Sequence, residues 1–126
     1  EGTWTATTTE SGNTTCRDIR CGDMCLVTGS VSNLANTSSS LVEITGLPFN
    51  NLNAGQVGQV SYIGALRGYN LGTNVGNSRP PVNTVLENNK IYVGTAQGSG
   101  GWDMLQYNEL SNSANAIQFN IMYQTA

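Results

Sequence analysis

Two stretches in the second half of the chain combine aromatic rings with polar groups and glycines, which suits a ligand site. The first, GGWDMLQYNE, contains Trp102 and Tyr107, whose rings can stack on a sugar. It also contains Asp103 and Asn108, whose oxygen atoms can bind sugar hydroxyl groups. The alternative, which we prefer for Trp102, is that this residue belongs to the core of a late strand. The stretch is a candidate binding segment with a competing structural interpretation.

The second stretch, LRGYN, places Arg67, Tyr69 and Asn70 at the start of the longest irregular segment, which runs from Asn70 to Pro81. Irregular segments carry binding residues more often than the elements that they connect. The alternative is an ordinary pair of surface residues. If the chain binds a ligand, we expect the contacts on loops around residues 67–81 and 98–108.

The chain lacks the residues of the common hydrolytic mechanisms. It contains no histidine, which excludes Ser-His-Asp and Cys-His catalysis and removes the usual general base. Eight carboxylates are present, but none lies in a recognised motif, and Asp23 has the character of a hairpin turn residue. The sequence GSGG at 98–101 lacks the lysine of a phosphate-binding loop. We expect no enzymatic activity and no cofactor.

Three cysteines, Cys16, Cys21 and Cys25, fall within ten residues. Their odd number leaves at least one thiol free or paired between chains. A zinc site needs about four ligands, and the chain has no histidine to complete one. We therefore expect reduced thiols that behave as small buried apolar groups, no bound metal, and folding in a reducing cytoplasm.

The composition restricts the classes of partner. Charged residues make up 10% of the chain, compared with about 25% in an average domain. The polar surface must therefore consist of Ser, Thr, Asn and Gln, which suits extracellular stability, sugar contacts or packing against copies of the chain. Five scattered basic residues and a net charge of −3 argue against nucleic-acid binding. No run of 18 apolar residues is present, so we expect no membrane insertion.

Short strand-like runs alternate with turns rich in glycine and asparagine, which predicts an all-β fold. The expected strands are Thr3–Thr9, Met24–Ser32, Ser40–Thr45, Val57–Leu66, Asn83–Glu87, Lys90–Thr95, Trp102–Tyr107 and Ala116–Thr125. About eight short strands indicate an antiparallel two-sheet sandwich, jelly-roll-like in its connections. Residues 1–126 make one domain, which we interpret as a piece of a longer chain because it starts at Glu1.

The stretch LVEITGLPFNN, which starts at Leu41, passes from strand alternation into an apolar turn. Pro48 cannot donate to a sheet ladder and so ends the strand, while Gly46 permits the sharp turn. Leu47 and Phe49 are then free to cap the core or to contact a neighbouring chain. The sequence leaves both roles open.

The predicted strand Met24–Ser32 carries apolar residues on both faces, with Met24 and Leu26 opposite Cys25 and Val27. A strand that is apolar on both faces is covered on both, and in a two-sheet domain a symmetry mate would supply the second cover. The candidates for a trimer contact or a core cap are therefore Met24, Leu26, Leu47 and Phe49.

Four motifs occur along the chain in a recognisable order. EGTW opens it, RCGDMCLVTGSVS gives a hairpin that leads into a long strand, VEITGLPF follows, and IQFNIMYQT closes it. This order resembles the C-terminal head domains of bacteriophage tail fibres and tailspikes, in which a Gly-Thr-Trp start, a GN-x-V-x-V-x-G hairpin strand and an I-x-GLPF turn recur. The resemblance is weak from about Arg67 to Gln106. An aromatic residue common before the family's hairpin is replaced here by Cys16 or Ile19.

The resemblance implies a β-sandwich that forms a homotrimer at the distal tip of a fibre in the virion, after folding in the host cytoplasm. It implies attachment to a bacterial surface receptor, either a glycan or an outer-membrane protein, rather than catalysis. The family names no universal receptor residues, so none is carried over. Two alternatives remain: a structural trimerisation and capping domain, and a free-standing carbohydrate-binding module or capsid-like jelly roll.

Overall fold

A computed structural model describes residues 1–10, 12–52, 61–72, 80–96 and 102–126. These residues form antiparallel β-strands and one short 3-10 helix, so the prediction of an all-β antiparallel fold is confirmed. The elements are β1 (Gly2–Trp4), β2 (Thr7–Thr8), β3 (Asn13–Cys21), β4 (Met24–Ser32), β5 (Glu43–Thr45), β6 (Tyr62–Tyr69), β7 (Pro81–Glu87), β8 (Lys90–Ala96), β9 (Trp102–Met104), η1 (Tyr107–Glu109) and β10 (Ala116–Gln124).

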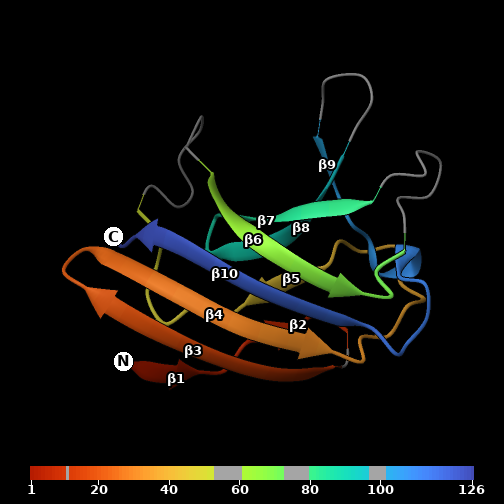
Figure 1. The fold of residues 1–126 in the computed structure, drawn as a ribbon, viewed down its shortest axis with the longest axis horizontal. Helices are drawn as coiled ribbons and strands as arrows, with labels where there is room; N and C mark the ends of the chain where they lie inside the picture. Colours follow the sequence, from red (N-terminus) through yellow and green to blue (C-terminus); the bar gives the residue numbers. More distant parts are fainter. Residues whose placement is uncertain (11, 53–60, 73–79, 97–101) are drawn as a thin grey trace.

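The strands belong to one ten-stranded sheet with the order β1-β3-β4-β10-β6-β7-β8-β5-β2, and β9 pairs with β8 beside this path. Only Thr5 and Ala6 separate β1 at one edge from β2 at the other, so the sheet curls until its edges approach each other (Figure 1). The Thr14 hydroxyl donates to the Ala6 carbonyl oxygen across this gap, at 3.4 Å. The sheet is a half-barrel, and the described strands do not divide into the two separate sheets expected of a jelly roll.

Strand β6 connects the two halves of the curled sheet. Its segment Ala65–Tyr69 pairs with β10, whereas Tyr62–Gly64 pairs with β7. Gly64 lies where the pairing changes, and a Cβ atom there would collide with Ile121 Cγ1 and with the Asn120 carbonyl oxygen. The absence of a side chain at Gly64 therefore allows β6 to cross close to β10.

The core lies inside the curl, and β10 follows the predicted alternation. Its buried residues are Ile117, Phe119, Ile121 and Tyr123, and its exposed residues include Gln118, Asn120 and Gln124. Trp4 is buried against Phe119, with ring centroids 6.5 Å apart and an edge-to-face arrangement. The inward faces of β4, β5 and β8 complete this core.

Two hairpin turns agree with the sequence. Asn88 and Asn89 join β7 to β8 with φ values of 52° and 60°, as a type I′ turn requires. Gly22 and Asp23 join β3 to β4, and Gly22 has a φ of 58°. Asp23 is therefore a turn residue, as predicted.

Several predicted elements differ from the observed ones. Strand β3 was not expected, because its sequence NTTCRDIRC is mostly polar and buries only Cys16 and Asp18. The segment Thr3–Thr9 divides into β1 and β2, which lie at opposite edges of the sheet. The predicted strand Trp102–Tyr107 ends at Met104, and of the predicted Val57–Leu66 the positions 57–60 lie outside the described residues.

The apolar turn after β5 packs on the core from inside the same chain. Gly46 has a φ of 87°, which permits the turn, and Leu47 and Phe49 are half-buried against the core cluster. The Tyr123 hydroxyl donates to the Phe49 carbonyl oxygen at 2.8 Å, and the Arg20 guanidinium carbon lies 4.5 Å from the Phe49 ring centroid. Leu47 and Phe49 therefore pack on the core of their own chain.

We expect Phe49→Ala to lower the free energy of unfolding by about 1–3 kcal/mol. This is less than the roughly 3–5 kcal/mol typical of a fully buried phenylalanine, because the ring is only partly covered. Denaturant unfolding of wild type and variant at equal protein concentration measures the difference. Arg20→Gln should cost about 1 kcal/mol, because the exposed Arg20 side chain loses its cation–π contact and its hydrogen bonds to the Gly22 carbonyl oxygen and the Thr125 hydroxyl. A change below about 0.5 kcal/mol for Phe49→Ala would contradict the core-cap role.

Candidate functional site

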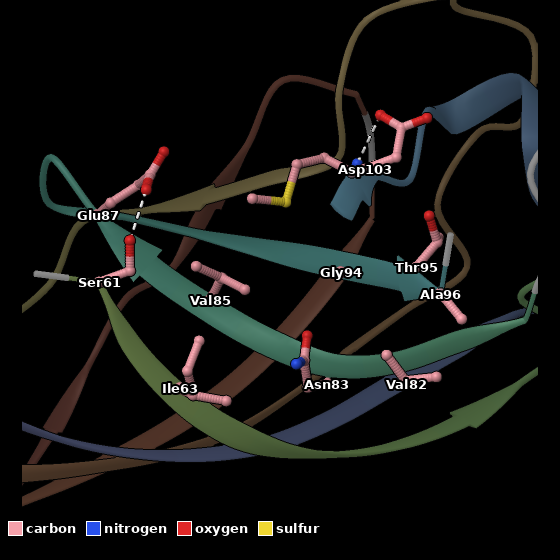
Figure 2. A pocket seen from close by; sticks show the side chains of 11 residues that line it. Ser61, Ile63, Val82, Asn83, Val85, Glu87, Gly94, Thr95, Ala96 and Asp103 are labelled. Atoms are coloured by element: carbon pink, nitrogen blue, oxygen red, sulfur yellow. Dashed lines mark hydrogen bonds between the residues drawn. The ribbon is translucent and has the colours of Figure 1, made fainter. Parts of the chain in front are cut away.

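A groove with a volume of about 350 Å³ lies on the outer face of the sheet, over β6, β7, β8 and β9 (Figure 2). Figure 2 shows Ile63, Val82, Asn83 and Val85 along β6 and β7, with Ser61 and Glu87 at one end. Strands β8 and β9 contribute Gly94, Thr95, Ala96, Asp103 and Met104. Four strands thus supply one concave surface that faces away from the core.

The groove has an apolar floor on the side of the sheet where polar residues are usual. Val85 is only 8% exposed although it lies outside the core cluster, and its register partner on β6 is Ile63. Ile63 is 60% exposed and Val82 is 54% exposed. An antiparallel sheet with one solvated face normally alternates apolar-in and polar-out. Packing among the described residues therefore leaves the Ile63 and Val82 side chains of this floor open to solvent.

Two buried polar atoms in the groove have no hydrogen-bond partner among the described residues. They are Asn83 Oδ1 and Thr95 Oγ1. Thr95 is 3% exposed. Gly94 faces Asn83 in the register, and a Cβ atom at Gly94 would collide with Asn83 Oδ1. The backbone of β8 therefore leaves room for the Asn83 amide without providing a partner for its oxygen.

The charged groups that line the groove are carboxylates. Glu87 Oε2 accepts a hydrogen bond from the Ser61 hydroxyl at 2.7 Å, and Asp103 Oδ1 accepts one from the Met104 amide at 2.8 Å. No lysine or arginine occurs among the described residues that line the groove. The nearby Lys90 is bound to Glu43 at 3.1 Å, and this hydrogen bond raises the pKa of Lys90. The described lining therefore carries two acidic groups and is rich in hydrogen-bond acceptors.

The predicted binding residues on β6 lie beside this groove and not in it. Arg67 and Tyr69 are exposed and follow Ile63 along the same face of the strand. Asn70 has a structural role instead, because its φ is 51° and its Nδ2 donates to the Ala114 carbonyl oxygen at 2.9 Å. Most of the loop that follows, residues 73–79, lies outside the described residues.

The other predicted binding residues separate from one another. Asp103 lines the groove, and Asn108 is exposed on η1. Trp102 belongs to β9, but its side chain lies outside the described part of the structure, as do residues 97–101. Tyr107 is fully buried, so the expectation that its ring stacks on a ligand is wrong. Its amide donates to the Ser40 carbonyl oxygen at 3.0 Å, which fixes η1 over the core.

Sequence reasoning did not select Asn83, Val85, Glu87 or Thr95. One pattern was available, because the adjacent apolar pair Val85–Leu86 must place one apolar side chain on each face of β7. No sequence pattern marks Asn83 Oδ1 and Thr95 Oγ1 as atoms without a hydrogen-bond partner, because their possible partners depend on which strands lie next to each other.

No significant match to the chain was found among protein-family models, curated proteins or solved structures. The likeness of its motifs to phage fibre heads therefore remains a prediction from the sequence.

A second apolar surface lies on the outer face of the other half of the sheet. Ile19, Leu26 and Met122 are register partners across β3, β4 and β10, and Met24 precedes Leu26 on the same face of β4. Ile19 and Met122 are more than half exposed, and Met24 is 41% exposed. We call these four residues the apolar row. The candidates for a trimer contact or a core cap thus divide, with Met24 and Leu26 outward and Leu47 and Phe49 against the core.

The three cysteines are free thiols, and they differ in exposure. Cys16 and Cys25 are buried, and burial raises the pKa of both thiols. Cys21 is exposed at the end of β3, so the expectation that it is buried is wrong. No cluster of three or more potential metal-ligating His, Cys, Asp or Glu side chains occurs in the described ranges. Within those ranges no helix is long and apolar enough to cross a membrane.

We expect one thiol to react quickly with a thiol reagent in the native protein, because only Cys21 is accessible and the buried thiols resist ionisation. All three should react after unfolding without a reductant. Cys21→Ser should abolish the fast phase and leave two thiols. Fewer than three thiols in unfolded wild type, or one zinc ion per chain by elemental analysis, would contradict this expectation.

Proposed function

We propose that this chain is a non-enzymatic, receptor-binding head domain of a phage tail fibre or tailspike, and that it binds a bacterial surface receptor through the groove. The observation that carries the proposal is the pairing of an exposed apolar floor with the orphaned atoms Asn83 Oδ1 and Thr95 Oγ1. A buried polar atom without a partner costs about 1–3 kcal/mol. A ligand that supplies the missing partner recovers this free energy, which gives the orphaned atoms a binding role.

The apolar row supports the homotrimer that belongs to this proposal. Its residues lie near the β3–β4 turn, at the end of the molecule that also holds the N-terminus (Figure 1). A fibre shaft would enter at the N-terminus, so contacts between copies at this end would align the heads on the shaft. Three linked sites would also raise apparent affinity by a factor of about 10² or more over one weak site.

The test is a competition assay with bacteria that the parent phage infects. Preincubation with the purified domain should reduce phage adsorption. Ile63→Asp places a charge on the apolar floor and should abolish the protection, whereas Ala65→Asp is a matched control. Ala65 lies two residues along the same exposed face of β6 but does not line the groove. Both variants should keep the wild-type melting temperature within a few degrees.

A structural capping domain is the second candidate, because the apolar row needs only other copies of the chain as partners. The two candidates differ in one result. A stable trimer that never reduces phage adsorption would favour the capping role and contradict receptor binding.

A further inference from the structure

We infer that the groove accepts one uncharged sugar unit and selects against acidic sugars, an inference that rests on the proposed receptor-binding function. The polar lining consists largely of acceptors. Asn83 Oδ1 and the Glu87 carboxylate can only accept hydrogen bonds, and the Thr95 hydroxyl can accept or donate. The complementary ligand presents several donors, which the hydroxyl groups of a sugar supply.

The apolar floor limits the ligand further. Val85 and Ile63 form a patch that requires a nonpolar face on whatever lies against it. A pyranose ring offers both surfaces, because its C–H groups form a nonpolar face while its hydroxyl groups project from the rim. The groove volume of about 350 Å³ lies near the lower end of the roughly 300–1,000 Å³ of small-molecule sites. One sugar unit fits this size better than an extended stretch of glycan buried along its length.

The charge of the lining decides between kinds of sugar. Glu87 and Asp103 bring two carboxylates to the groove, and its described lining positions include no lysine or arginine. A carboxylate or phosphate on the ligand would be repelled and would lose hydration without gaining a partner. An uncharged sugar avoids both penalties.

The orphaned atoms allow binding to be separated from folding. Asn83→Ala and Thr95→Val remove the two orphaned oxygen atoms, Asn83 Oδ1 and Thr95 Oγ1, so stability should stay constant or rise. Binding should weaken about three- to tenfold in each variant if these atoms contact the ligand. A merely structural role would produce the opposite pattern, with lower stability and unchanged affinity. Thr28→Val, on the outer face of β4, serves as a control that should change neither.

The experiment is a titration of the purified domain, followed by amide chemical shifts, with matched sugar pairs. The probes are the methyl glycosides of glucose and galactose, and those of glucuronic and galacturonic acid, which differ from them by a carboxylate at C6. We expect at least one neutral glycoside to bind with millimolar affinity and its acidic counterpart to bind at least about fivefold more weakly. Glu87→Gln should reduce that ratio by about two- to fivefold.

Each other outcome overturns the inference. Equal or tighter binding of the acidic glycoside contradicts selection against acidic sugars. If none of the probes binds, the inference that the ligand is a sugar is wrong. These failures remain distinct from failure of the proposed function. A domain that protects bacteria from adsorption but binds none of the sugars keeps its receptor-binding role, and a protein receptor then replaces the sugar.

Discussion

Replacing Gly64 by alanine is expected to lower the free energy of unfolding by about 3 kcal/mol or more. Overpacking usually costs about 1–3 kcal/mol, and here one of the obstructing atoms is a backbone oxygen, that of Asn120, which cannot change rotamer. Relief would require β6 to move away from β10, at the point where β6 leaves β10 to pair with β7. Denaturant unfolding at a fixed protein concentration measures the loss.

Ala65→Ser is the matched control, because Ala65 is the next residue on β6 and is exposed. Surface substitutions of this kind usually change stability by less than about 0.5 kcal/mol. If Gly64→Ala were as mild as Ala65→Ser, the close crossing of β6 and β10 would be wrong.

Placing charges in the apolar row is expected to convert the proposed homotrimer into a monomer. The double variant Leu26→Lys with Met122→Glu puts opposite charges on register partners, so the two new side chains attract each other within the chain. Each half-exposed apolar side chain contributes about 1–2 kcal/mol when a second copy covers it, and a buried unpaired charge costs several kcal/mol. Sedimentation equilibrium at micromolar concentration should give three times the 13.3 kDa chain mass for wild type and one chain mass for the variant.

The control is Thr28→Glu with Asn120→Lys, the next register pair on the same outer face, with the order of the charges reversed because Arg17 is the register partner of Thr28 on β3. These positions carry polar side chains, so one positive and one negative charge there should leave the trimer intact. A monomeric wild type would contradict the trimer and, with it, much of the likeness to phage fibre heads. Loss of the trimer in both double variants would mean that the interface extends beyond the apolar row.

The sequence predicted best those features that are encoded in a single segment. Alternation in β10 identified every inward residue from Ile117 to Tyr123, because a half-buried strand repeats its burial every two residues. The Asn88–Asn89 turn and the Gly46 turn were also local, since each depends on a positive φ that few residues adopt. Strand β3 was missed because its nine residues bury only Cys16 and Asp18, which leaves little apolar alternation to detect.

The groove could not be predicted in the same way, because it depends on which strands become neighbours. Ile63 lies opposite Val85 because of the register between β6 and β7. Gly94 lies opposite Met104 because of the register between β8 and β9. Selection of candidate binding residues by their chemical type identified one residue of the groove, Asp103. The same criterion also selected Tyr107, which is buried. Aromatic residues are suited equally to a core and to a ligand, so residue type alone did not separate the two roles for Tyr107.

The most direct measurement of the central claim is a map of amide chemical shifts when the domain binds the receptor fraction of the bacterial envelope. We predict that the amides of Val85, Gly94 and Met104 shift in a saturable way, because these residues lie in the groove. The chemical shifts of the Thr28 and Ser30 amides, on the polar outer face of β4, should not change. Shifts confined to the face formed by β3, β4 and β10, with the groove unchanged, would contradict the account.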